Sequence, residues 1–257
     1  MVGGEGPCEV DVWFVTPSPR GGEVRSPGTG LVDGRHGDRT AGGVLSDGER
    51  DRAARFHRPR DREVYVAAHT TLRVLVGARL GIPPQDVPLG RAPCPLCGGP
   101  HGRPTVAGEA GLHVSLSRTE GSAAVALSSA VVGVDVESTG RAVTLDDLVV
   151  ALHPAELPVA DRELALRRWV RKEAYLKGLG TGLGIDPAAV DLSTDPAGWR
   201  VLDVPTAPGL LAAVAVRSPA TGAVTVTEVD LRDLVGGRAP RPSGPDADAL
   251  AAAPGGL

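Results

Sequence analysis

Two acidic residues in the segment Val-Gly-Val-Asp-Val-Glu, residues 132–137, have the spacing of a metal site. The valines alternate with Gly133, Asp135 and Glu137, which is the period of a half-buried β-strand. Asp135 and Glu137 then point to one side, about 7 Å apart along the strand. Two carboxylates at that spacing can hold one hard cation between them, and they can equally form the solvated face of an ordinary strand.

A second charged segment, residues 169–177, reads Trp-Val-Arg-Lys-Glu-Ala-Tyr-Leu-Lys. On a helix, residues four apart share a face, so Trp169, Glu173 and Lys177 form one stripe, with Lys172 one step round. A carboxylate therefore lies between an aromatic ring and an ammonium group. By itself, the Glu173–Lys177 pair can be a common surface pair that contributes about 0.2–0.5 kcal/mol.

Both segments, with Glu156 of an intervening His-Pro-Ala-Glu segment, occur in an order that resembles the Sfp-type 4′-phosphopantetheinyl transferases. The signature segments of that family read (V/I)G(V/I)D(V/I)E and W(S/T/V)xKE(A/S)xxK. The resemblance extends from about Val10 to about Asp233. It implies an α+β fold, with two similar α+β subdomains in a pseudo-twofold arrangement and a cofactor cleft between them.

The resemblance also implies an activity, which is the transfer of the 4′-phosphopantetheine group of coenzyme A to a serine of an apo carrier protein. The products are the holo carrier protein and 3′,5′-ADP. The carriers of such enzymes belong to fatty acid, polyketide or nonribosomal peptide synthases, including those of antibiotic biosynthesis. The sequence leaves open which carriers this chain would serve.

Carried over to this sequence, the family motifs imply that Asp135, Glu137 and Glu156 bind Mg²⁺, with Mn²⁺ as the alternative ion. Oxygen-only ligands suit Mg²⁺, which takes its remaining bonds from water and substrate phosphate. Glu173 is expected to be the general base, and Lys172 and Lys177 are expected to hold the pyrophosphate. Two neighbouring cations would lower the pKa of Glu173.

Further residues are expected to contact coenzyme A. Arg103, in Gly-Arg-Pro, matches the basic position of a G-(K/R)-P loop, and Ser115 matches the serine of an S-H-(S/T/A) segment. The chain departs from the family at Leu116, where a phosphate-binding histidine is usual. Arg118 or His113 would have to supply that cation. Arg52 is a further candidate near the 3′-phosphate, and Arg73 is either a binding residue or a structural one.

The chain of 257 residues is long enough for two such subdomains. We expect residues 1–130 to form the first, with a mobile loop at 17–44, and residues 131–235 to form the second. Residues 236–257 lack any hydrophobic period and are expected to be a disordered tail.

Hydrophobic periodicity and capping residues predict the elements that would position these side chains. Helices are expected from Ser46, over residues 61–80, and from Asp161 to Lys177. Strands are expected over residues 9–15, over 112–117 and 122–128 as a hairpin, and near 199–204, 210–217 and 224–229, the last two at sheet edges.

The formal net charge of −4 gives no global reason to expect nucleic-acid or membrane binding. Six arginines nevertheless crowd into residues 50–62, as a polyanion site would require. The sequence lacks an apolar run of about 18 residues and a signal segment, so we expect a cytoplasmic protein. Two fused halves with an internal cleft favour a monomer.

The segment Cys94-Pro-Leu-Cys97-Gly-Gly-Pro-His101 suggests zinc but offers three candidate ligands where a structural site needs four. We therefore expect a reduced, turn-forming cysteine pair. Two alternatives to the transferase remain: a Mg²⁺-dependent hydrolase of nucleotides or diphosphates that uses the same carboxylates, and a non-enzymatic zinc or nucleic-acid-binding module.

Overall fold

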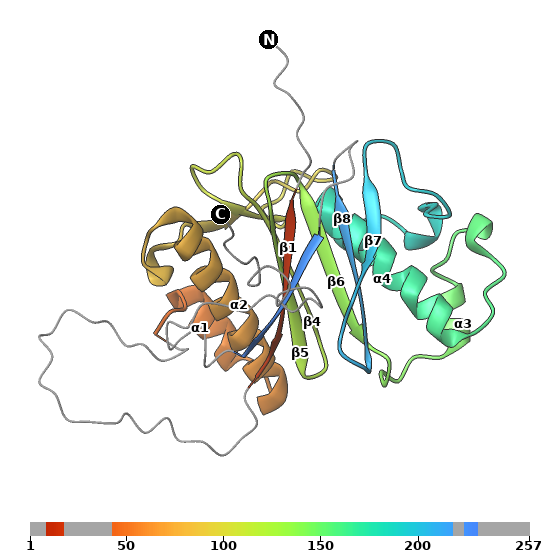
Figure 1. The fold of residues 1–257 in the computed structure, drawn as a ribbon, viewed down its shortest axis with the longest axis horizontal. Coiled ribbons are helices and arrows are strands. Elements are labelled where there is room, and N and C mark those ends of the chain that lie inside the picture. Colours follow the sequence, from red (N-terminus) through yellow and green to blue (C-terminus); the bar gives the residue numbers. More distant parts are fainter. Residues whose placement is uncertain (1–8, 18–42, 218–223, 231–257) are drawn as a thin grey trace, which may run out of the picture.

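Alternating apolar residues build two β-sheets that lie face to face in the middle of the molecule (Figure 1). The structure is a computed structural model that describes residues 9–17, 43–217 and 224–230. The predicted loop at 17–44 lies almost wholly outside these residues. The predicted tail at 236–257 lies entirely outside them.

The first sheet has the strand order β2-β3-β4-β5-β1-β9. Its strands are antiparallel except for β9, which runs parallel to β1. The predicted hairpin is confirmed as β4 and β5. The bounds are β1 Val10–Thr16, β2 Leu89–Arg91, β3 Pro104–Val106, β4 His113–Thr119, β5 Ser122–Ser128 and β9 Val224–Asp230.

Helix α2 (Pro59–Leu80) covers the outer face of this sheet with the apolar stripe that the sequence predicts. It is preceded by α1 (Asp47–Ala54), which begins at Ser46 in the predicted capping box. The short 3-10 helix η1 (Pro84–Asp86) follows α2.

The second sheet has the order β6-β8-β7, and helix α4 (Arg162–Leu179) packs on its outer face. Asp161 caps the start of α4, as predicted, and Gly180 ends it in the left-handed conformation. The remaining bounds are β6 Val132–Ser138, α3 Leu145–Val149, η2 Pro154–Glu156, η3 Gly182–Gly184, η4 Pro187–Ala189, β7 Arg200–Val204 and β8 Leu210–Val216.

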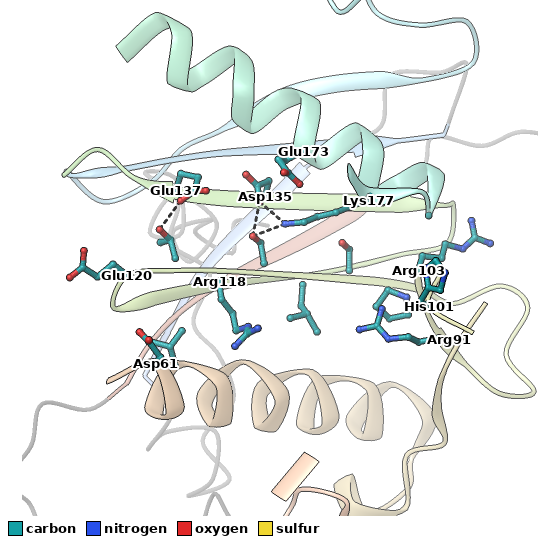
Figure 2. Close-up of a pocket in the computed structure, with 18 of the residues that line it drawn as sticks. Asp61, Arg91, His101, Arg103, Arg118, Glu120, Asp135, Glu137, Glu173 and Lys177 are labelled. Atoms are coloured by element: carbon teal, nitrogen blue, oxygen red, sulfur yellow. Dashed lines mark hydrogen bonds and ion pairs between the residues drawn. The ribbon is translucent and has the colours of Figure 1, made fainter. Parts of the chain in front are cut away.

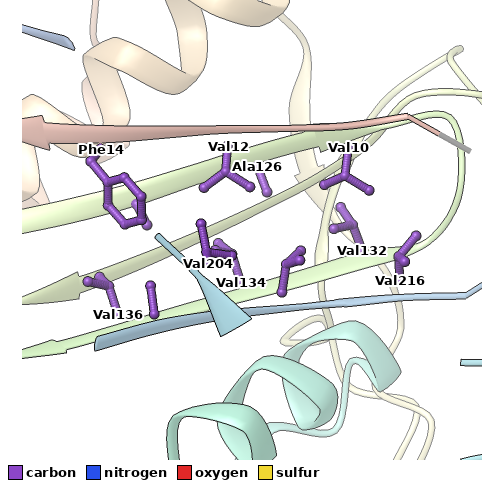
Figure 3. Packing of buried hydrophobic residues seen from close by; sticks show 12 residues of the cluster. Val10, Val12, Phe14, Ala126, Val132, Val134, Val136, Val204 and Val216 are labelled. Atoms are coloured by element: carbon purple, nitrogen blue, oxygen red, sulfur yellow. The ribbon is translucent and has the colours of Figure 1, made fainter. Parts of the chain in front are cut away.

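The inner faces of the two sheets share one core, in which Val12 and Phe14 of β1 meet Val134 and Val136 of β6 (Figure 3). The layers are therefore α2, first sheet, second sheet and α4 (Figure 1). This is an α+β fold of two halves, each with one sheet and one long helix, which confirms the predicted fold class.

Of the two last strands, both expected at sheet edges, one prediction is wrong and one is confirmed. Strand β8 lies between β6 and β7 and is not an edge strand. Its two faces are both buried, one by α4 and one by the first sheet, so its Leu-Ala-Val run lacks a polar face. Strand β9 is an edge strand, as predicted, and its pairing with β1 in the first sheet was not predicted.

Over the described residues, the structure contains no helix of the length and apolarity needed to cross a bilayer.

Candidate active site

A cleft of about 750 Å³ opens between the two halves of the fold. One wall comes from the start of α2 and the loop before it, the floor from β4, and the other wall from β6 and α4 (Figure 2). Strand β3 pairs with β4 only at His113, so the remainder of that edge of β4 is left to border the cleft. The volume is in the usual range for a site that binds a small molecule or cofactor.

The wall formed by β6 and α4 carries Asp135, Glu137 and Glu173 and is called the acidic wall. It depends on an unusually close approach of α4 to β6. A Cβ atom added to Gly133 of β6 would overlap the carbonyl oxygen of Ala174 and would lie 2.9 Å from Cα of Gly178. A Cβ on Gly178 would in turn lie 2.7 Å from the ring of Trp199. Two glycines therefore let the helix that carries Glu173 and the strand that carries Asp135 pack backbone to backbone.

Asp135 is the centre of the hydrogen-bond network in the cleft. Its Oδ1 atom accepts hydrogen bonds from Ser117 Oγ at 2.6 Å and from Lys177 Nζ at 2.5 Å (Figure 2). Its Oδ2 atom is buried and has no hydrogen-bond partner among the described residues. A buried carboxylate oxygen without a donor is costly, and a bound cation would satisfy it.

Glu137 and Glu173 lie near enough to Asp135 for their charges to interact. Burial, and then the charge of Asp135, raises the pKa of Glu137 above its usual value of 4.5. Burial likewise raises the pKa of Glu173; Lys177 opposes this shift, and Asp135 and Glu137 add to it. Three oxygen-donor side chains thus share one wall of the cleft, and this donor set fits Mg²⁺ or a similar hard cation.

The predicted lowering of the Glu173 pKa is wrong in direction. It assumed that Lys172 and Lys177 both lie beside Glu173, but of these two lysines only Lys177 lines the cleft, and the further lowering effect of Arg141 is small. Burial, with two carboxylates nearby, outweighs the effect of that single ammonium group.

The expected grouping of Glu156 with the other metal ligands is also wrong, and so is the expected position of Lys172 in the phosphate site. Lys172 is fully buried and forms an ion pair with Glu156 at 2.7 Å. Its Nζ atom also donates to the carbonyl oxygens of Pro187 and Val190. One step round α4 is enough to turn Lys172 away from the cleft and into the interior, where Glu156 is its partner.

The opposite end of the cleft is basic. Arg91, His101 and Arg103 gather there, and Arg118 projects from β4 toward α2 (Figure 2). The guanidinium of Arg118 lies 4.9 Å from the ring centre of Tyr65, a cation–π contact that holds the side chain in place.

Comparison with known proteins gives matches to one family. Residues 131–209 match the family model described as the 4′-phosphopantetheinyl transferase superfamily. The chain is also 29% identical over 193 residues to the 4′-phosphopantetheinyl transferase HetI of Nostoc sp., a match that covers 67% of this chain and 78% of HetI. Residues 131–209 are therefore similar to 4′-phosphopantetheinyl transferases.

The matched segment begins at β6 and contains α4, so Asp135, Glu137, Glu173 and Lys177 all lie within it. The basic side of the cleft comes from the residues before it. Of the residues expected there, Arg103, Arg118 and Ser115 line the cleft, whereas Arg52 does not. The buried Ser115 hydroxyl accepts a hydrogen bond from the backbone N–H of Val134 at 3.0 Å and so ties β4 to β6.

Arg73 has a structural role in the first half of the fold. Its side chain is buried, and its Nε atom donates to Glu49 at 2.6 Å, while Nη1 reaches the carbonyl oxygen of Val87 at 3.2 Å.

Several residues of the cleft were not named individually as site residues from the sequence. Ser117 and Thr119 continue the alternation that begins at Ser115, and they bond Asp135 and Glu137. Hydroxyl side chains at every second position of a strand lie on one face, so this pattern could have indicated the contacts from the sequence alone. The cleft is also lined by three arginines, of which the first two belong to the arginine-rich segment: Arg58, Arg60 and Arg91.

Proposed function

We propose that this protein is an Sfp-type transferase that moves the 4′-phosphopantetheine group of coenzyme A to a serine of an apo carrier protein and releases 3′,5′-ADP. Transfer of phosphopantetheine to carrier proteins is the general activity of the superfamily to which residues 131–209 match. The observation that carries the proposal is the buried Oδ2 of Asp135, which has no partner in the described part of the chain and lies in a cleft with two further carboxylates and a basic end.

Asp135 and Glu137 are the proposed ligands of a divalent cation, with Mg²⁺ as the expected ion. When bound, this ion neutralises charge on the pyrophosphate. Ser117 donates a hydrogen bond to Asp135 Oδ1 and Thr119 donates one to Glu137 Oε2, which fixes both carboxylates in place. The other oxygen of Glu137, Oε1, pairs with Arg141, so a bound cation would replace Arg141 as its partner.

Glu173 is the proposed general base for the carrier serine. A base works best when its pKa lies near the pH at which the enzyme acts, and burial moves Glu173 in that direction. Lys177 contacts Asp135 and Ser117 from the same helix. From there, its ammonium group is placed to bind the pyrophosphate and to stabilise charge as the phosphorus–oxygen bond breaks.

The arginines at the other end of the cleft are proposed to bind the remaining phosphate charge of coenzyme A, with Arg103 and Arg118 as the principal contacts. Arg118 is proposed to take the place of the histidine that Leu116 replaces, because residues two apart on a strand share a face and both of these residues line the cleft. One chain supplies both walls of the cleft, so we infer that a monomer suffices.

Intact-mass spectrometry of an apo carrier protein, incubated with the enzyme, coenzyme A and Mg²⁺, tests the proposal. Transfer adds roughly 340 Da to the carrier. Asp135→Asn is expected to abolish the addition, and Asp146→Asn, which changes an exposed aspartate outside the cleft, is the matched control. Release of 3′,5′-ADP with no change in carrier mass would instead identify a hydrolase and overturn the proposal.

A further inference from the structure

The loop between β2 and β3 brings together three side chains that bind transition metals. The donor atoms of Cys94, Cys97 and His101 all lie within 4.8 Å of one another. Cys97 Sγ and His101 Nε2 are 3.0 Å apart. Around a tetrahedral zinc ion, Zn–S bonds of about 2.3 Å and Zn–N bonds of about 2.0 Å put the ligand atoms roughly 3.5–3.8 Å apart. The three atoms therefore need only small movements to surround an ion.

The backbone of this loop is folded around the two sulfur atoms. Cys94 N–H donates to the carbonyl oxygen of Gly99 at 2.7 Å, and Gly98 N–H donates to that of Cys94 at 2.8 Å. Gly98 has φ of 73°, a left-handed conformation that glycine adopts readily. Gly99 N–H then points at Cys97 Sγ, 3.4 Å away. Such N–H groups stabilise a metal-bound thiolate.

The ring of His101 lies directly beside the sulfur of Cys97. A Cβ atom on Gly99 would lie 3.1 Å from His101 Nε2 and 3.3 Å from Cys97 Sγ, so glycine leaves room for the ring to meet the sulfur. A turn formed only by a reduced cysteine pair does not require a histidine there. Neither cysteine is in a disulfide, so both sulfurs are available as ligands.

We propose that Cys94, Cys97 and His101 bind one Zn²⁺ ion, with a water molecule in the fourth position. Cys97 and His101 are exposed, which leaves that position open to solvent. Two thiolates and one imidazole favour zinc over Mg²⁺, so this ion is distinct from the one proposed at Asp135 and Glu137.

The zinc ion would close the loop that carries the basic end of the cleft. Arg91 Nη1 donates to the carbonyl oxygen of Gly102 at 3.0 Å, and Ala92 N–H donates to that of Arg103 at 3.0 Å. His101 itself lines the cleft. A metal bound to His101 would therefore stiffen the segment that positions Arg103.

The test is the metal content of the full chain, purified without chelator and with any affinity tag removed, by elemental mass spectrometry. We expect about one zinc per chain, and less than roughly a tenth of that in Cys97→Ser and in His101→Gln. Cys97 and His101 are exposed, so both variants should fold normally. The controls Cys8→Ser and His57→Gln, which remove a thiol and an imidazole elsewhere in the chain, should keep the zinc.

A second readout uses Co²⁺ added to the zinc-free chain. Co²⁺ bound by thiolates gives a charge-transfer absorption band that should be present in the wild type and absent in Cys97→Ser. A wild-type chain without zinc and without this band would overturn the proposal, and so would unchanged zinc in Cys97→Ser. Neither readout depends on phosphopantetheine transfer, so failure here is distinguishable from failure of the proposed function.

Discussion

Replacing Glu156 by glutamine separates a structural role from a metal-binding one. The structure places Glu156 against Lys172, which has no exposed surface, and away from the cleft. Glutamine keeps a neutral amide oxygen but removes the negative charge, so the buried Lys172 ammonium would have only neutral acceptors, among them the carbonyl oxygens of Pro187 and Val190. Breaking a buried ion pair on one side costs about 3–5 kcal/mol.

For a chain of this length, that loss corresponds to a fall in melting temperature of roughly 10 °C. At 20 °C, the fraction of Glu156→Gln that stays folded should transfer phosphopantetheine at a rate within about twofold of wild type. Calorimetry and the carrier-mass assay measure the two quantities. Glu163→Gln, which changes an exposed residue of α4, is the control and should alter neither.

The double variant Glu156→Leu/Lys172→Met should recover much of the lost stability, because apolar residues often replace a buried ion pair at little cost. A Glu156→Gln chain with a normal melting temperature and no Mg²⁺-dependent activity would refute this reasoning. It would show that Glu156 is a metal ligand after all.

Three further outcomes follow from the structure. Gly133→Ala should push α4 away from β6, destabilise the protein by about 3 kcal/mol in urea unfolding and abolish transfer. The control is Gly48→Ala, whose added methyl group meets open space and should leave the stability unchanged. Equal stability of the two variants would contradict the close packing of α4 on β6. Burial opposes ionisation of Glu49, but hydrogen bonds, the first from His69, lower its pKa from 4.5 to about 2. Its ionised form therefore stabilises the fold above pH 4.5, and this contribution is lost as the pH falls toward 2. Glu49→Gln should cost about 2 kcal/mol at pH 7, allowing for partial exposure, and much less at pH 3; a pH-independent cost would refute the assignment. Leu116→His should lower the KM for coenzyme A by roughly tenfold if the added imidazole reaches a phosphate, and an unchanged KM would mean that another cation already fills that place.

Local sequence signals predicted the elements that carry the acidic wall. Alternation in residues 132–137 predicted strand β6 with Asp135 and Glu137, and Asp161 marked the start of α4, whose predicted end at Lys177 is two residues short of Leu179. These features depend on neighbours in the sequence, so they could be found without coordinates.

The errors concern interactions between distant segments. The pairing of Lys172 with Glu156 depends on how the loop before α4 folds back on that helix, and no periodicity encodes it. The parallel pairing of β9 with β1 joins residues more than 200 positions apart in the sequence. The raised pKa of Glu173 follows from burial in the folded protein, which helix spacing cannot show.

An anomalous difference map from crystals grown with coenzyme A and Mn²⁺ would test the central claim most directly. We predict a peak between Asp135 and Glu137, at roughly 2.0–2.3 Å from their oxygen atoms, with the pyrophosphate on the ion and Glu173 alongside. A manganese peak at Glu156, or coenzyme A bound outside the cleft between the two sheets, would contradict the account.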